Sequence, residues 1–201
     1  MRSILILLFE AAFLSSLAQF SGSIEFKYYT VRDTSLNTYW IKGKMIRLDQ
    51  YEKKKNTIEG SFLFDLDSNT VKFVNPKRKV WGYQKSDLAP VIKGKCDVSK
   101  GKDKIINGVK CQEYVVKNTE ENTVITYYIT SKNYDFFIPM MKLWNRKDKQ
   151  SIYFGNIQGL PKGSMPVMSE ERQISDNTMI SKLEIIKFNK VAVAQSKFDT
   201  N

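Results

Sequence analysis

The side chains that could carry out chemistry in this sequence are carboxylates, thiols and aromatic rings, because histidine is absent. Without histidine, no Ser-His-Asp or Cys-His arrangement is possible. Paired acids remain at Asp65 and Asp67 and at Glu170 and Glu171, and two carboxylates are what a glycosidase needs. The first pair is typical of a turn, and the second, beside Arg172, is typical of an exposed edge. We therefore expect no enzyme, and a carboxylate-based hydrolase is the least favoured alternative.

The first residues of the chain predict the cellular compartment of the protein. Residues 1–18 combine a positive start, an apolar stretch and small residues at Ser16 and Ala18, as in a cleaved signal peptide. The stretch is too short for a stable membrane span, although Glu10 within it leaves an N-terminal anchor as the alternative. Cleavage leaves residues 19–201 as one predicted domain.

The mature chain is predicted to be periplasmic or secreted. No further apolar run is long enough to span a bilayer. No cysteine lies near the predicted cleavage site after Ala18, so a lipid anchor is not expected there. In an oxidising compartment, Cys96 and Cys111 are predicted to form a disulfide, which would stabilise the fold by roughly 3 kcal/mol. Two thiols without histidine cannot complete a zinc shell, so neither a metal site nor a cofactor is expected.

The formal net charge of +11 points to acidic partners. Basic residues gather at residues 53–55, 77–79 and 93–104. An exported protein is not expected to meet nucleic acid, so an anionic envelope surface is the candidate partner. The alternative is that the lysines only keep the surface solvated.

Period-two alternation of apolar and polar residues dominates the chain and predicts strands. Short turns between these segments predict an antiparallel meander. The expected fold is mainly β (α+β), a single curved antiparallel sheet in an unclosed half-barrel. The clearest predicted strands cover residues 23–28, 38–41, 45–48, 61–66, 71–73, 80–84, 111–116, 124–130, 151–156, 165–174 and 177–188.

One segment has helical spacing. Phe137, Met140, Met141 and Trp144 fall at i, i+3, i+4 and i+7, which predicts a short amphipathic helix. A sheet must have one face covered. We expect this helix and the polar loop of residues 86–107 to cover the concave face.

Large aromatic and methionine side chains suggest either a ligand cavity or an ordinary core. Trp40 and Trp81 lie on predicted strands, and Met141 and Trp144 on the predicted helix. An apolar cavity between sheet and helix could hold a lipid. From these residues alone, an ordinary core is the preferred interpretation.

The chain resembles the LolA-like lipoprotein-carrier fold, and more closely an uncharacterised family of exported Bacteroidetes proteins assigned to that fold. The most specific feature is the Gly-x-x-Cys-x-x-Tyr pattern from Gly108 to Tyr114. Further resembling segments are residues 20–24, 39–47, 64–67, 74–76, 159–161, 179–188 and Phe198. The resemblance implies an unclosed curved sheet whose concave side binds lipid or lipoprotein acyl chains.

The leading hypothesis is therefore a non-enzymatic envelope protein that binds a hydrophobic or amphiphilic ligand between sheet and helix. The second hypothesis is an envelope scaffold for protein–protein interaction without a small ligand. The candidate ligand-binding residues are Trp40, Trp81, Phe137, Met140, Met141 and Trp144.

Overall fold

The computed structural model describes residues 19–52, 57–84 and 91–200. The predicted signal peptide, residues 1–18, lies outside the described residues. The chain folds into strands β1 (Gly22–Thr30), β2 (Thr34–Lys42), β3 (Met45–Tyr51), β4 (Ile58–Asp65), β5 (Thr70–Asn75), β6 (Val80–Tyr83), β7 (Asp97–Ile106), β8 (Val109–Asn118), β9 (Thr123–Thr130), β10 (Met165–Gln173) and β11 (Met179–Asn189). The helices are α1 (Phe137–Trp144), α2 (Lys149–Phe154) and the 3₁₀ helix η1 (Gln195–Phe198).

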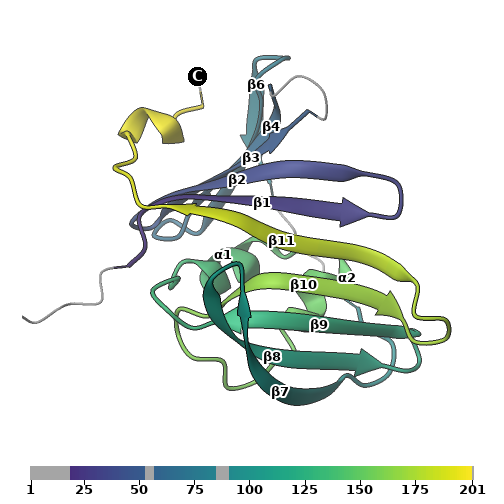
Figure 1. Cartoon of the computed structure of the whole chain (residues 1–201). Coiled ribbons are helices and arrows are strands. Elements are labelled where there is room, and N and C mark those ends of the chain that lie inside the picture. The colour runs from purple at the N-terminus through teal and green to yellow at the C-terminus, as the bar shows by residue number, and fades with distance from the viewer. Residues whose placement is uncertain (1–18, 53–56, 85–90, 201) are drawn as a thin grey trace, which may run out of the picture.

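The strands form one antiparallel sheet in the order β6-β5-β4-β3-β2-β1-β11-β10-β9-β8-β7. The sheet consists of two meanders that meet where β1 pairs with β11, with Tyr28 opposite Leu183. The sheet is strongly curved, and α1 and α2 lie against one side of it, behind β9 and β10 in Figure 1. Because β6 and β7 lie at opposite ends, the sheet is unclosed, as the sequence predicts.

The predicted hairpins are confirmed, and their turns show why they form. Gly43 joins β2 to β3 with a φ of 59°, a left-handed conformation that costs glycine little. Asn69 and Asn107 adopt φ values of 53° and 49° in the turns after β4 and β7. Asparagine tolerates this region better than most residues, so the turn residues fix the strand register.

The main core lies between the concave face of the sheet and the two helices. Period-two alternation directs Tyr39 and Ile41 of β2 toward this face. Helix α1, predicted at the same residues, buries Phe137, Met140 and Trp144 against it. The indole of Trp144 lies 5.2 Å from the ring of Phe62 and 5.3 Å from that of Phe64. Aromatic packing thus attaches α1 to the N-terminal meander.

A second, smaller core covers the convex face. Leu63 and Val74 pack there against Val193 and Phe198 from the C-terminal segment. Trp40 points to this face, because its neighbours Tyr39 and Ile41 point to the other. The ammonium group of Lys197 lies 4.3 Å from the centre of the Trp40 ring.

A buried carboxylate organises this convex side. Asp49 has no exposed surface and accepts hydrogen bonds from Trp40 Nε1 (2.9 Å), Arg47 Nε (2.6 Å) and Ser61 Oγ (2.6 Å). Arg47 also donates to the carbonyl oxygen of Lys197 (2.9 Å). Asp49, Trp40, Arg47 and Ser61 form what we call the Asp49 cluster. Through Arg47, this cluster links η1 to β3.

The predicted loop of residues 86–107 is corrected in part. Residues 86–90 lie outside the described residues, and residues 91–96 are irregular, with Ile92 and Cys96 packed against the main core, but Asp97–Ile106 is strand β7. Nearly all of β7 is exposed at the edge of the sheet, so polar residues occupy both of its faces. Without a buried face, no apolar alternation appears in the sequence. This segment continues the sheet rather than covering its concave side.

The predicted strand at residues 151–156 is also wrong, since Lys149–Phe154 forms helix α2. Asp148 is the N-cap: its Oδ1 accepts a hydrogen bond from the backbone N–H of Ser151 at 3.0 Å. Within this helix, the side chains of Tyr153 and Phe154 are buried. A helix of six residues is too short to show its periodicity clearly.

The predicted disulfide is contradicted by the strand register. Cys111 lies opposite Lys104, whereas Cys96 precedes Asp97, which lies opposite Lys117 at the other end of the hairpin. At about 3.3 Å per residue, the two cysteines are roughly 20 Å apart, far beyond disulfide distance. Both thiols are free in the structure.

Candidate functional site

A pocket of about 120 Å³ lies between the concave face of the sheet and the two helices. Strands β1, β2 and β11 contribute Phe26, Tyr28, Tyr39 and Leu183 to its walls. Helix α1 contributes Phe137, Met141 and Trp144. We call this space the sheet pocket.

One side of the sheet pocket is polar and built from buried side chains. The Gln150 side chain accepts a hydrogen bond from Ser169 Oγ and donates one to Ser181 Oγ (2.6 Å). Ser181 in turn donates to Glu171 Oε2 (2.7 Å). The Tyr127 hydroxyl donates to the backbone carbonyl oxygen of Gln150 (2.7 Å). This network fixes the start of α2 onto β9, β10 and β11.

Charged residues lie where the sheet pocket meets the α1–α2 connection. Arg146 and Asp148 line the pocket and form an ion pair, with Nε 2.5 Å from Oδ2. The Arg146 guanidinium lies 4.6 Å from the centre of the Trp144 ring. Burial raises the pKa of the Tyr28 phenol above its ordinary value, so this side chain contributes no charge to the pocket.

A second pocket, of about 430 Å³, lies between α1, α2 and the following loop. We call it the helix pocket. Ile138, Ile157 and Leu160 give it apolar walls, and Lys142 adds a positive charge. Its lining shares with the sheet pocket Met141, Arg146, Ser151 and Phe154. The two pockets are therefore adjacent, and these four side chains lie between them.

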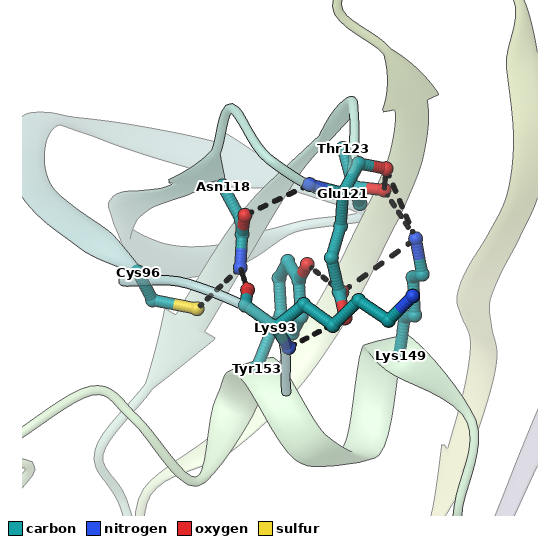
Figure 2. Close-up of polar contacts among 7 residues, drawn as sticks. All are labelled: Lys93, Cys96, Asn118, Glu121, Thr123, Lys149 and Tyr153. Carbon is teal, nitrogen blue, oxygen red and sulfur yellow. Dashed lines mark hydrogen bonds and ion pairs between the residues drawn. The ribbon is translucent and has the colours of Figure 1, made fainter. Parts of the chain in front are cut away.

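Helix α2, which lines both pockets, is held in place by Glu121 in the β8–β9 turn (Figure 2). The Tyr153 hydroxyl donates a hydrogen bond to Glu121, and Lys149 Nζ lies 3.6 Å from the same carboxylate. Lys149 Nζ also donates to Thr123 Oγ1 (2.6 Å) and the Glu121 carbonyl oxygen (3.3 Å). The backbone N–H of Lys93 donates to Glu121 Oε1 (3.0 Å).

Asn118 completes this Glu121 cluster (Figure 2). Its amide donates to the Lys93 carbonyl oxygen (2.8 Å) and lies 3.8 Å from the Cys96 sulfur. The hydrogen bond from Tyr153, followed by the one from Lys93, lowers the pKa of Glu121. The charged carboxylate therefore joins three segments: the β8–β9 turn, α2 and the residues before β7.

The structure brings together three of the six predicted ligand-binding residues. Phe137, Met141 and Trp144 line the sheet pocket. Met140 is fully buried and does not line either pocket.

The two strand tryptophans lie elsewhere. Trp40 is on the convex face under η1. Trp81 is on edge strand β6, opposite Val74, and half of its surface is exposed (50%).

The two acid pairs lie at separate places in the fold, one at the turn after β4 and the other on β10. Asp65 Oδ1 accepts hydrogen bonds from the backbone N–H groups of Asp67 (2.9 Å) and Ser68 (3.2 Å), as expected of a turn. Glu171 is buried, which corrects the expectation of an exposed edge, because β10 pairs with strands on both sides. Within residues 19–52, 57–84 and 91–200, no group of three or more His, Cys, Asp or Glu side chains could hold a metal.

Sequence reasoning missed the polar part of the site, which Arg146, Asp148 and Gln150 provide. Asp148, directly before the first residue of α2, is a residue type favoured at helix N-caps, and this signal was available in the sequence. None of the helices within the described parts of the chain is long and apolar enough to cross a membrane.

Comparison with protein-family models found no match, and neither did comparison with curated proteins. Among solved structures, the chain is similar to one in the Pseudomonas aeruginosa MucA/MucB complex, with a TM-score of 0.53 and 13% identity over 92% of this chain and 57% of that one. A structure of MucB in complex with MucA(peri) gives a TM-score of 0.51 and 10% identity over 92% and 56%. This chain thus spans little more than half of those chains, and the likeness shows a shared fold alone.

A putative outer membrane lipoprotein-sorting protein domain from Vibrio parahaemolyticus is also similar. It is 10% identical over 92% of this chain and 91% of that one, with a TM-score of 0.38. Because that score is low, we draw no conclusion from it.

Proposed function

We propose that this protein is a non-enzymatic envelope protein that binds an amphiphilic ligand with an acyl chain, such as a lipid or the acyl group of a lipoprotein. The observation that carries the proposal is the pair of neighbouring pockets, each with apolar side chains in its walls and each lined by Arg146. The sheet pocket is smaller than typical ligand sites of roughly 300–1,000 Å³, whereas the helix pocket falls within that range. The ligand therefore occupies the helix pocket and extends past Met141 toward the sheet.

The charges suggest how such a ligand is oriented. Lys142 and Arg146 both line the helix pocket, so an anionic headgroup is favoured at its rim. The acyl chain contacts the apolar side chains of Ile138, Ile157 and Leu160. This arrangement separates the charged and apolar ends of one molecule.

Native mass spectrometry of protein purified from the cell envelope tests the proposal. We expect additional mass that corresponds to lipid and that disappears after delipidation. Tritiated palmitate added to the delipidated protein should then bind at one site. Protein that carries no lipid and takes up no palmitate would contradict the proposal.

A scaffold for protein interaction is the second candidate. The fold is shared with a chain of the MucA/MucB complex, whose printed description names two proteins together. This candidate predicts that a protein, rather than a lipid, is recovered with the chain under mild purification.

A further inference from the structure

The hairpin of β5 and β6 forms one free edge of the sheet and is unusually exposed. Every residue from 76 to 84 is exposed to solvent. The exposed fractions of Val80, Trp81 and Tyr83 are 53%, 50% and 62%. Soluble proteins seldom expose several large apolar side chains side by side, so this surface is typical of a site that contacts a partner.

The aromatic side chains of the hairpin share the convex face. Trp81 lies opposite Val74, and Tyr83 lies opposite Lys72. Their ring centres are 5.9 Å apart. The Lys72 ammonium group lies 5.2 Å from the Trp81 ring and 5.4 Å from the Tyr83 ring. Two amphipathic rings and a cation therefore form one exposed surface.

The charge of the hairpin is entirely positive. Residues 70–84 contain Lys72, Lys77, Arg78 and Lys79 but no aspartate or glutamate. Lys77 forms an ion pair with Glu52, so Arg78 and Lys79 in the exposed turn carry most of the free charge. Positive charge beside tryptophan and tyrosine is the composition that settles at a membrane–water interface.

We infer that the β5–β6 hairpin docks the protein on an anionic lipid bilayer. Trp81 and Tyr83 enter the headgroup region, while Arg78 and Lys79 contact anionic headgroups. The surface lies on the convex face, away from the sheet pocket. This inference goes beyond the proposed ligand binding and holds whether or not a ligand enters the pockets.

The alternative occupant, a strand of another protein added to β6, fits this edge less well. Strand β6 has only four residues, and short edge strands with nearby lysines disfavour pairing. The turn also contains no acidic side chain that could form an ion pair with basic residues of a protein partner. Charge and aromatic composition together therefore favour the bilayer.

Vesicle binding by the purified full mature chain tests the inference. The probes are vesicles of phosphatidylcholine alone and vesicles that also contain phosphatidylglycerol. We expect co-sedimentation with the anionic vesicles, weakening as salt is added. Trp81 is the most exposed tryptophan, because Trp144 is buried and Trp40 half-buried, so its fluorescence should shift to the blue on binding.

Matched variants localise the contact. A K77Q/R78Q/K79Q variant should bind anionic vesicles at least about tenfold more weakly, because each basic residue at the surface strengthens binding severalfold. The control K95Q/K100Q/K102Q removes the same charge from the exposed segment around β7 and should bind like the wild type. W81S/Y83S should lose both binding and the blue shift.

Three outcomes overturn the inference. These are equal binding to neutral and anionic vesicles, equal losses in the hairpin and control variants, and an unshifted Trp81 spectrum on saturating anionic vesicles. The last measurement uses the wild-type protein and does not depend on the variants folding. Failure here with palmitate uptake intact would leave the proposed ligand binding standing.

Discussion

Arg146 lies over the face of the Trp144 indole, with its guanidinium carbon 4.6 Å from the ring centre. The same guanidinium pairs with Asp148, the N-cap of α2. The end of α1, the start of α2 and both pockets therefore meet at this one side chain. Arg146 therefore brings charge and apolar surface together within the candidate site.

Replacing Arg146 should weaken binding of anionic amphiphiles selectively. We expect Arg146→Gln to lower the affinity for palmitate about tenfold, because a charge-assisted contact is lost. The affinity for uncharged hexadecanol should change little. Isothermal titration calorimetry on delipidated protein measures both.

Arg172 offers a matched control for that experiment. Its Nε lies 2.5 Å from Glu170 Oε1, two residues earlier, so Arg172→Gln removes a similar local ion pair outside the pockets. Equal effects of the two substitutions on palmitate binding would exclude Arg146 as a headgroup contact.

A larger side chain in the wall that the two pockets share should reduce ligand uptake. Met141→Trp adds bulk between the pockets, so we expect at least a tenfold loss of palmitate binding, because the indole and the acyl chain cannot occupy the same space. Ile105→Trp, at a position 76% exposed, makes the same kind of addition away from the pockets. Native mass spectrometry should show uptake by the second variant and not by the first.

Asp49 should contribute strongly to stability. Asp49→Asn leaves the largely buried Arg47 guanidinium, 12% exposed, without a counter-charge, and we expect a loss of about 3 kcal/mol in the free energy of unfolding. The exposed turn substitution Asp67→Asn should change it by less than about 0.5 kcal/mol. Urea denaturation measures both, and a small effect at Asp49 would contradict the role assigned to its cluster.

The Glu121 cluster predicts a specific acid sensitivity. The pKa of Glu121 is lowered in the folded protein, so its stabilising effect is complete above the unfolded value of 4.5. That effect is lost as the pH falls through the lower, folded value. Glu121→Gln should therefore flatten the acid side of a plot of melting temperature against pH, and an unchanged slope would argue against the Glu121 cluster as the holder of α2.

The free cysteines give a chemical test of the fold. Unfolded, unreduced protein should take up two iodoacetamide groups, because no disulfide joins Cys96 and Cys111. In the folded protein, burial raises the pKa of Cys111 to about 11, so its alkylation should be slow near neutral pH and accelerate as the pH approaches that value. Mass spectrometry that finds no alkylation before reduction would contradict the register of β7 and β8.

Sequence patterns predicted the sheet and α1 because their residues have one buried and one exposed face. Helix α1 presents Phe137, Met140 and Trp144 to the core, so its period is visible. Strand β7 has no buried face, and α2 is too short for a clear period, so neither pattern could be recognised.

The candidate site was predictable only on its apolar side. Phe137, Met141 and Trp144 follow from one helix period. The position of Trp40 could have been corrected by strict alternation with Tyr39. Arg146 and Gln150 meet partners distant in sequence, and no local pattern encodes such contacts.

The pairing of β1 with β11 at the centre of the sheet has a consequence for folding. Each meander contains contacts between neighbouring segments, which form early, whereas Ser23 pairs with Asn189, more than 160 residues later in the chain. Contacts that are distant in sequence form slowly, because the intervening chain must first be ordered. Phe26 of β1 and Leu183 of β11 both line the sheet pocket, so the pocket is completed only when the two meanders join. The proposed ligand binding therefore requires the fully folded chain, and neither half alone should acquire it.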